Sequence, residues 1–138
     1  DRLRAAPATI DGAVEELLRY DSPAQFISRT ATVDFAWRGA AIRAGDAVLA
    51  CLGAANRDPA VFADPDRLDL ARTPNPHLAF GQGVHFCLGA NLARLEMKVV
   101  YEEMLAEFAG WELAGPLEWT RSNRHTGIRH LPVRLHRG

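Results

Sequence analysis

A cysteine stands at the end of a glycine-rich segment, directly before an amphipathic stretch of the chain. The segment covers residues 80–89 and contains Gly81, Gly83, Cys87 and Gly89. At the start of a helix, the helix dipole and the unpaired first-turn N–H groups stabilise a thiolate, which can ligate a metal or attack an electrophile. The glycines favour positive φ angles or the close approach of a bulky partner. We therefore expect a flat cofactor to lie against this loop, with Cys87 as its axial ligand.

Two helices are predicted to carry this loop and to pack beside it. Residues 8–20 have apolar side chains at helical spacing, with Thr9 as the expected N-cap and residues 21–23 as the stop before a proline. The second helix is predicted from near Leu88 to about Phe108, with Gly110 as its C-terminal stop. One apolar stripe runs along the second helix, formed by Leu88, Leu92, Leu95 and Val99.

The remaining segments are predicted to be strands and loops. Residues 25–52 read as β-structure, with turns expected at 38–39 and 44–46. Residues 53–79 read as an irregular loop, and a loop of such length in a compact domain is usually functional. Short extended pieces are expected at 111–113, 117–119 and 131–135.

The composition excludes several classes of protein. The chain has 138 residues, a formal net charge of −1, 48% hydrophobic and 24% charged residues, which is ordinary for one soluble domain. This charge gives no bulk attraction to nucleic acid or membranes, and no apolar run reaches the roughly 18 residues that span a bilayer. Two cysteines, Cys51 and Cys87, do not make a disulfide framework, so we expect a cytoplasmic protein.

The cysteine segment and three other motifs together resemble the cytochrome P450 family in its soluble bacterial form. The first motif is Phe80-Gly81-x-Gly83-x-His85-x-Cys87-x-Gly89-x-x-Leu92-Ala93-Arg94-x-Glu96, which is similar to that family's heme-binding segment. The others, in family order, are Glu16-Leu17-Leu18-Arg19, then Asn56-Arg57-Asp58-Pro59 followed by Phe62, Asp64-Pro65 and Arg72, and His77-Leu78-Ala79 directly before the cysteine segment.

The resemblance implies an α+β, mainly helical fold that corresponds to the C-terminal portion of the cytochrome P450 fold. Residues 1–138 would form the heme-binding part of one domain, with heme b (iron protoporphyrin IX) as cofactor and Cys87 as the axial iron ligand. The chain begins just before the Glu-x-x-Arg helix, so we expect a fragment or a truncated product. The distal helix and most of the substrate pocket of family members have no counterpart here, and this piece by itself is expected to be inactive.

The resemblance also assigns roles to the residues around the cofactor. His85 and Arg29 would hold heme propionates, since a guanidinium binds a carboxylate in bidentate fashion. Phe80 would pack beside the thiolate and limit solvent access. A solvated strand arginine and ordinary core packing are the alternatives for Arg29 and Phe80. The cofactor-binding set is completed by Gly81, Gly89 and His77.

A structural ion network is expected away from the chemistry, and no residue of this chain is assigned as catalytic. Glu16 and Arg19 are three residues apart and form either an exposed ion pair or, as the resemblance implies, a buried pair completed by another arginine. Arg72 is the first choice for that arginine and Arg57 the second. Such a network would hold the geometry of the loop.

The function implied by the resemblance is a heme-thiolate monooxygenase that uses dioxygen, a small organic substrate and electrons from a ferredoxin-type reductase system. The polar residues 124–126, at the tip of the C-terminal hairpin, indicate either a polar substrate or a solvent-facing turn. A non-catalytic heme-binding remnant is the alternative. A nucleotide-binding loop is disfavoured because no third glycine follows at the required spacing, and zinc because too few Cys and His ligands are present.

Overall fold

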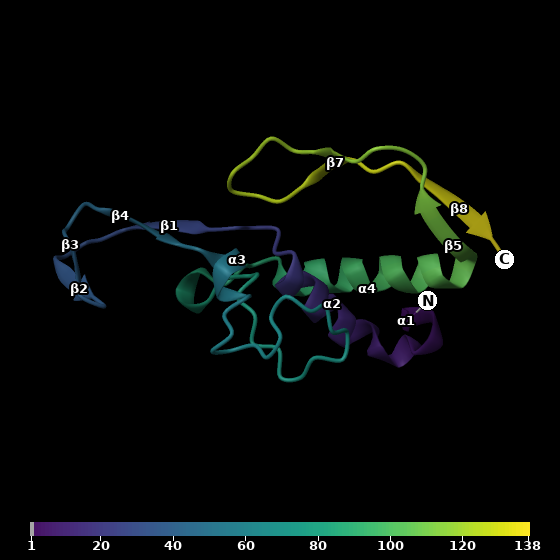
Figure 1. Cartoon of the computed structure of the whole chain (residues 1–138), viewed down its shortest axis with the longest axis horizontal. Coiled ribbons are helices and arrows are strands. Elements are labelled where there is room, and N and C mark those ends of the chain that lie inside the picture. Colours follow the sequence, from purple (N-terminus) through teal and green to yellow (C-terminus); the bar gives the residue numbers. More distant parts are fainter. Residues whose placement is uncertain (1) are drawn as a thin grey trace.

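Two helices carry the core of the chain, α2 (Ile10–Tyr20) and α4 (Ala90–Glu107), and they lie side by side in Figure 1. The computed structural model describes residues 2–138. In chain order, the remaining elements are α1 (Arg2–Ala5), the 3-10 turn η1 (Pro7–Thr9), β1 (Ile27–Thr30), β2 (Phe35–Trp37), β3 (Ala40–Ile42), β4 (Ala47–Ala50), α3 (Leu52–Ala55), the 3-10 turn η2 (Gly83–His85), β5 (Phe108–Leu113), β6 (Glu118–Trp119), β7 (Ile128–His130) and β8 (Val133–Arg137).

The first predicted helix is confirmed, with a different start. Its expected first turn is the 3-10 turn η1, and the α-helix begins at Ile10. Thr9 occupies the N-cap position of α2, but its hydroxyl donates to the carbonyl of Ala6 at 2.7 Å rather than capping the helix. The buried residues Ile10, Val14 and Leu18 form the apolar face of α2, as their spacing predicts.

The packed face of α4 is not the predicted apolar stripe. Leu88, Leu92, Leu95 and Val99 are all exposed. The residues that lie against α2 and the adjoining loop are instead Ala90, Arg94, Met97, Tyr101 and Leu105. This second row has nearly the same spacing as the first, but Arg94 interrupts its apolar pattern. Within this chain, α4 therefore contacts α2 through the row that contains Arg94, and the wholly apolar stripe is exposed.

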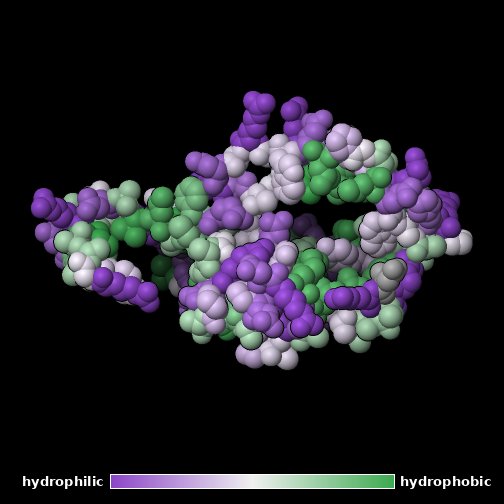
Figure 2. Space-filling view, viewed as in Figure 1, coloured by the Kyte–Doolittle hydropathy of each residue, from purple (hydrophilic) through white to green (hydrophobic). Residues whose placement is uncertain are grey.

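The β-structure predicted at 25–52 forms two antiparallel pairs. Strand β1 pairs with β4, and the short hairpin β2–β3 lies at the far end of the same arm (Figure 1). The expected turns are confirmed: Arg38 and Gly39 have φ angles of 48° and 85°, and Gly45 has 93°. The arm projects from the helical body, and Figure 2 shows hydrophobic side chains along it.

The C-terminal strands form two further antiparallel pairs. Strand β5 pairs with β8, and β6 pairs with β7, a strand that the sequence analysis missed. Gly110 does not stop α4, because the helix ends at Glu107 and Gly110 lies within β5. The pairing register shifts between Phe108 and Gly110, so the glycine belongs to a bulge in the sheet.

The loop predicted at 53–79 is irregular apart from the end of α3, and it wraps around one end of α2. Its turns are closed by backbone hydrogen bonds, for example from Phe62 N–H to the Asp58 carbonyl at 2.9 Å. Carbonyls of Asn56, Pro65 and Arg67 point at one buried side chain, Arg19. A charged side chain on α2 therefore organises this loop.

Candidate functional site

The cysteine loop turns sharply before it enters α4. Gly81 and Gly83 have φ angles of 72° and 76°, a conformation that favours glycine. The N–H of Cys87 donates to the Phe80 carbonyl at 3.0 Å, which closes the loop. The helix begins at Ala90, two residues later than the sequence predicts, and the Cys87 carbonyl accepts its N–H at 3.2 Å. The Cys87 thiol is free and exposed.

Gly89 differs from the other glycines of the loop. Its φ angle is −85°, so the expectation of a positive φ does not apply to this residue. A Cβ at Gly89 would meet no atom within 4 Å. Nothing in the described part of the chain thus requires glycine at this position.

A cavity of about 340 Å³ lies between the cysteine loop and the segment that leads into β1. It brings together five of the residues predicted from the sequence, Arg29, Phe80, Gly81, His85 and Cys87. The other lining residues are Pro23, Ala24, Ile27, Leu52, Ala79, Gln82 and His125. The wall is mainly apolar, with a thiol, a guanidinium and two imidazoles as its chemically active groups.

The C-terminal hairpin tip is tied to this cavity by hydrogen bonds. Gln25 N–H donates to the Arg124 carbonyl at 2.8 Å, and Thr126 N–H donates to the Pro23 carbonyl at 2.9 Å. The Gln25 side chain adds a hydrogen bond to the Thr126 hydroxyl at 2.6 Å. These bonds place His125 on the cavity wall. His125 is nevertheless exposed, so it both lines the cavity and lies on a solvent-facing turn.

His77 does not line this cavity. Its side chain is buried, and Nε2 lies 3.0 Å from Oε2 of Glu15 on α2. The N–H of Ala79 donates to Nδ1 at 3.2 Å, so Nε2 carries the proton and donates to Glu15. Burial lowers the pKa of His77 below its usual 6.5, although the Glu15 carboxylate opposes that effect. The structure thus gives His77 a carboxylate partner on α2.

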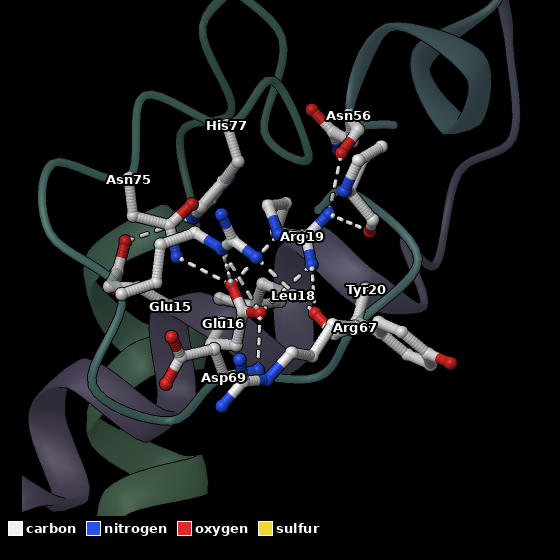
Figure 3. A network of polar contacts seen from close by, with 12 residues as sticks. Glu15, Glu16, Leu18, Arg19, Tyr20, Asn56, Arg67, Asp69, Asn75 and His77 are labelled. Carbon is white, nitrogen blue, oxygen red and sulfur yellow. Dashed lines mark hydrogen bonds and ion pairs between the residues drawn. The ribbon is translucent and has the colours of Figure 1, made fainter. Parts of the chain in front are cut away.

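A buried ion network joins α2 to the loop 53–79 (Figure 3). The Glu16 carboxylate accepts two hydrogen bonds from Arg19 at 2.8 Å, one from Asp69 N–H at 2.9 Å and one from Arg72 Nε at 3.1 Å. Burial alone would raise the pKa of Glu16, but these donors outweigh it and lower the pKa from 4.5 to about 2. The pair Glu16–Arg19 is thus buried rather than solvated, and Arg72 joins it.

Arg57, the second candidate for the additional arginine of the network, makes different contacts. Its guanidinium pairs with Asp66 at 2.7 Å and lies over the Tyr20 ring, 4.3 Å from the centroid. Asn56 is a contributor that the sequence analysis named only as part of a motif. It is fully buried, and its side-chain oxygen accepts the Leu78 N–H at 2.7 Å. It therefore joins the ion network to the chain that enters the cysteine loop.

The groups around Cys87 fit a heme by their chemistry. A thiolate is a soft ligand suited to iron, while Arg29 and His85 are donors suited to carboxylates. The apolar wall suits a porphyrin ring. Val84 and Leu88, on either side of the cysteine, are fully exposed in this chain, and Phe86 is half exposed. Apolar side chains in such number around a free thiol are typical of a surface that another group covers.

The fold and the sequence of the cysteine loop point to one protein family, and comparisons with known proteins identify it. The model of the family described as cytochrome P450 matches residues 8–118. The chain belongs to the cytochrome P450 family. Its fold is the matching portion of the cytochrome P450 fold, a mixture of helices and strands.

Individual relatives give the extent of the similarity. The chain is 52% identical to cytochrome P450 126 of Mycobacterium tuberculosis over 99% of its own length and 33% of the relative's. It is 49% identical to nocardicin C N-oxygenase of Nocardia uniformis over 95% of its length and 34% of the relative's. The crystal structure of P450BioI with an acyl carrier protein superimposes with a TM-score of 0.94 at 43% identity, over 98% of this chain and 35% of that one. The chain thus spans about a third of the length of these relatives.

No helix within residues 2–138 combines the length and the apolar character needed to cross a membrane.

Proposed function

We propose that residues 1–138 form the heme-holding part of a single cytochrome P450 domain, a monooxygenase in which Cys87 is the axial ligand of heme b. The observation that carries this proposal is the mainly apolar cavity whose lining includes Cys87, Arg29 and His85. With a thiolate ligand, heme supplies the activation of dioxygen for insertion of one oxygen atom into an organic substrate.

The residues of this chain bind and shield the cofactor in this proposal. Cys87 supplies the thiolate from a loop whose backbone is closed by the hydrogen bond to the Phe80 carbonyl. Arg29 and His85 hold the two propionates by charge-assisted hydrogen bonds. Phe80 excludes water from one side of the sulfur. The exposed Leu88, with the apolar row that continues along α4, is covered by protein outside this chain.

The substrate is proposed to be a small organic molecule with a hydrogen-bonding group. His125 supports this because it lines the same cavity as Cys87 and is held there by the backbone bonds of the hairpin tip. Electrons are proposed to come from a ferredoxin-type donor in the cytoplasm. Because the chain covers about a third of its relatives, turnover is proposed for the complete protein and not for this piece alone.

Absorption spectroscopy tests the proposal. The protein encoded by the complete reading frame that contains these residues is reduced and exposed to carbon monoxide. A red-shifted Soret band of the thiolate type is expected, and it is lost in Cys87→Ser. Cys51→Ser is the matched control, because Cys51 is the other free, exposed cysteine and lies outside the cavity. No heme uptake by the wild-type protein, or an unchanged band in Cys87→Ser, would refute the assignment.

A further inference from the structure

The ring of Phe80 is enclosed by three other side chains. The Arg94 guanidinium lies over its face, with Cζ 4.7 Å from the ring centroid. The rings of His77 and Phe86 lie 6.2 Å and 6.3 Å away, tilted by 53° and 67°. Phe80 also lines the cavity that Cys87 lines, and its backbone carbonyl accepts a hydrogen bond from the Cys87 N–H. A change in the position of Phe80 would therefore change both the cavity wall and the backbone of the cysteine loop.

One carboxylate on the neighbouring helix holds two of these three groups. Glu15 accepts two hydrogen bonds from Arg94, at 2.6 Å and 2.9 Å, and one from His77 Nε2 at 3.0 Å. The hydrogen bond from Arg94 is the main reason that the pKa of Glu15 is lowered, so the carboxylate is ionised. Without Glu15, the Arg94 guanidinium over the ring and Nε2 of the His77 imidazole beside it lose their carboxylate partner.

This arrangement exceeds what an ordinary contact between two helices requires. A second ion pair, Lys98–Asp11 at 2.9 Å, also joins α4 to α2, and neither residue lines the cavity. The Glu15–Arg94 pair is less exposed and is bidentate. Bidentate geometry fixes the plane of the guanidinium, and a cation over a ring face attracts the ring.

We propose that Glu15 is a positioning residue for the thiolate site, acting through Arg94 and His77 on the ring of Phe80. Groups that orient the surroundings of a metal ligand tune the metal's reduction potential, and the hydrophobic shell controls solvent access. Glu15 thus sets the reduction potential of the bound heme without touching it. This inference rests on the proposed function, since it assigns a purpose to residues around the ligand Cys87.

The test compares Glu15→Gln with Asp11→Asn in the complete protein loaded with heme. Both substitutions neutralise one carboxylate of an ion pair between α2 and α4. The reduction potential and the Soret maximum of the reduced carbon monoxide complex are expected to shift in Glu15→Gln and to stay unchanged in Asp11→Asn. Equal behaviour of the two variants would overturn the proposal.

Two further variants show whether the effect passes through the ring. Arg94→Lys keeps a positive charge for Glu15 but removes the planar group from Phe80, so a shift is expected here too. In a Phe80→Leu background, Glu15→Gln is expected to add no further shift, because the group through which it acts is gone. Full additivity of the two substitutions would refute action through Phe80. Should Glu15→Gln not fold, Arg94→Lys carries the test.

A measurement without heme separates this inference from the proposed function. Amide hydrogen exchange of Cys87 in the cofactor-free protein reports the hydrogen bond to the Phe80 carbonyl. Faster exchange is expected in Glu15→Gln than in Asp11→Asn. If the wild-type protein takes up no heme, the proposed function fails while this readout still shows whether Glu15 positions Phe80. Unchanged exchange together with unchanged spectra would leave Glu15 with a structural role only.

Discussion

Glu16→Gln removes a charge from the centre of the buried network and leaves its shape almost unchanged. The carboxylate is fully buried and is the acceptor for Arg19, Arg72, the Asp69 N–H and the Asn75 side chain. A neutral amide keeps one oxygen acceptor and turns its NH₂ group toward other donors. The Arg19 guanidinium, also buried, is then left without a counter-ion. We expect this substitution to be among the most destabilising in the chain.

The size of the loss follows from the pKa and from the cost of a broken buried pair. The pKa of Glu16 is lowered from 4.5 to about 2, which at about 1.4 kcal/mol per pH unit corresponds to about 3 kcal/mol of stability at neutral pH. Removing one partner of a buried ion pair generally costs about 3–5 kcal/mol. The two values agree, so we expect the free energy of unfolding to fall by about 3 kcal/mol or more.

Urea denaturation of the complete protein measures this loss. With a slope of about 2 kcal/mol per molar urea, the midpoint is expected to fall by about 1.5 M. Glu112→Gln is the matched control: its ion pair with Arg134 is exposed, with side chains 54% and 66% accessible, and such pairs contribute about 0–1 kcal/mol. A midpoint shift in Glu16→Gln no larger than that of the control would refute the reasoning. Arg72→Gln, which leaves the Glu16–Arg19 pair in place but removes the Arg72 hydrogen bonds to Glu16 and to the carbonyls of Ala63, Asp64 and Arg67, is the second variant if Glu16→Gln does not fold.

Three other outcomes are expected. The stability that Glu16 contributes is complete above pH 4.5 and is lost as the pH falls toward its folded pKa of about 2. The urea midpoints of wild type and Glu16→Gln should therefore converge on acidification. A constant gap between the two midpoints would contradict this. Gly83→Ala should cost about 1 kcal/mol by denaturation, because φ is 76° but no atom lies within 4 Å of the new Cβ; a loss of several kcal/mol would show a clash instead. Arg29→Met should leave the unfolding midpoint unchanged, because Arg29 is exposed and the only hydrogen bond of its side chain in the described chain is to the neighbouring Ser28 carbonyl. The same substitution should speed the loss of heme to a competing apoprotein. Equal rates of heme loss in wild type and variant would remove Arg29 from the site.

The sequence predicted features in which local chemistry and spacing agree. Helix α2 follows from its apolar spacing and its proline stop, and the turns at 38–39 and 44–46 follow from glycines that tolerate positive φ. The cysteine loop was recognisable because the cysteine, the histidine and the glycines are close together in the chain. Such features depend on neighbouring residues in the chain, so they can be predicted without knowing which elements pack together.

Local sequence patterns were not enough where the deciding contact comes from a distant segment. Two rows of residues on α4 have nearly the same helical spacing, and the wholly apolar row is exposed within this chain. The row that faces α2 contains Arg94, whose charge is matched by Glu15, 79 residues away. The family resemblance groups His77 with the cofactor-binding residues, and nothing in the local sequence shows that its imidazole also contacts the same carboxylate. Gly110 looked like a helix stop but lies in the bulge of a sheet completed by the last strand.

The identity of the chain as a member of the cytochrome P450 family, its two principal helices and its cysteine loop were therefore determined by the sequence alone. Only the tertiary structure decided that Arg29, His85, His125 and Cys87 line one cavity, and that Glu15 binds the arginine that lies over the ring of Phe80. The physical reason is that backbone preferences and turn chemistry act over a few residues. The pairing of charges, the choice of a packed face and the closure of a cavity depend instead on which distant surfaces meet.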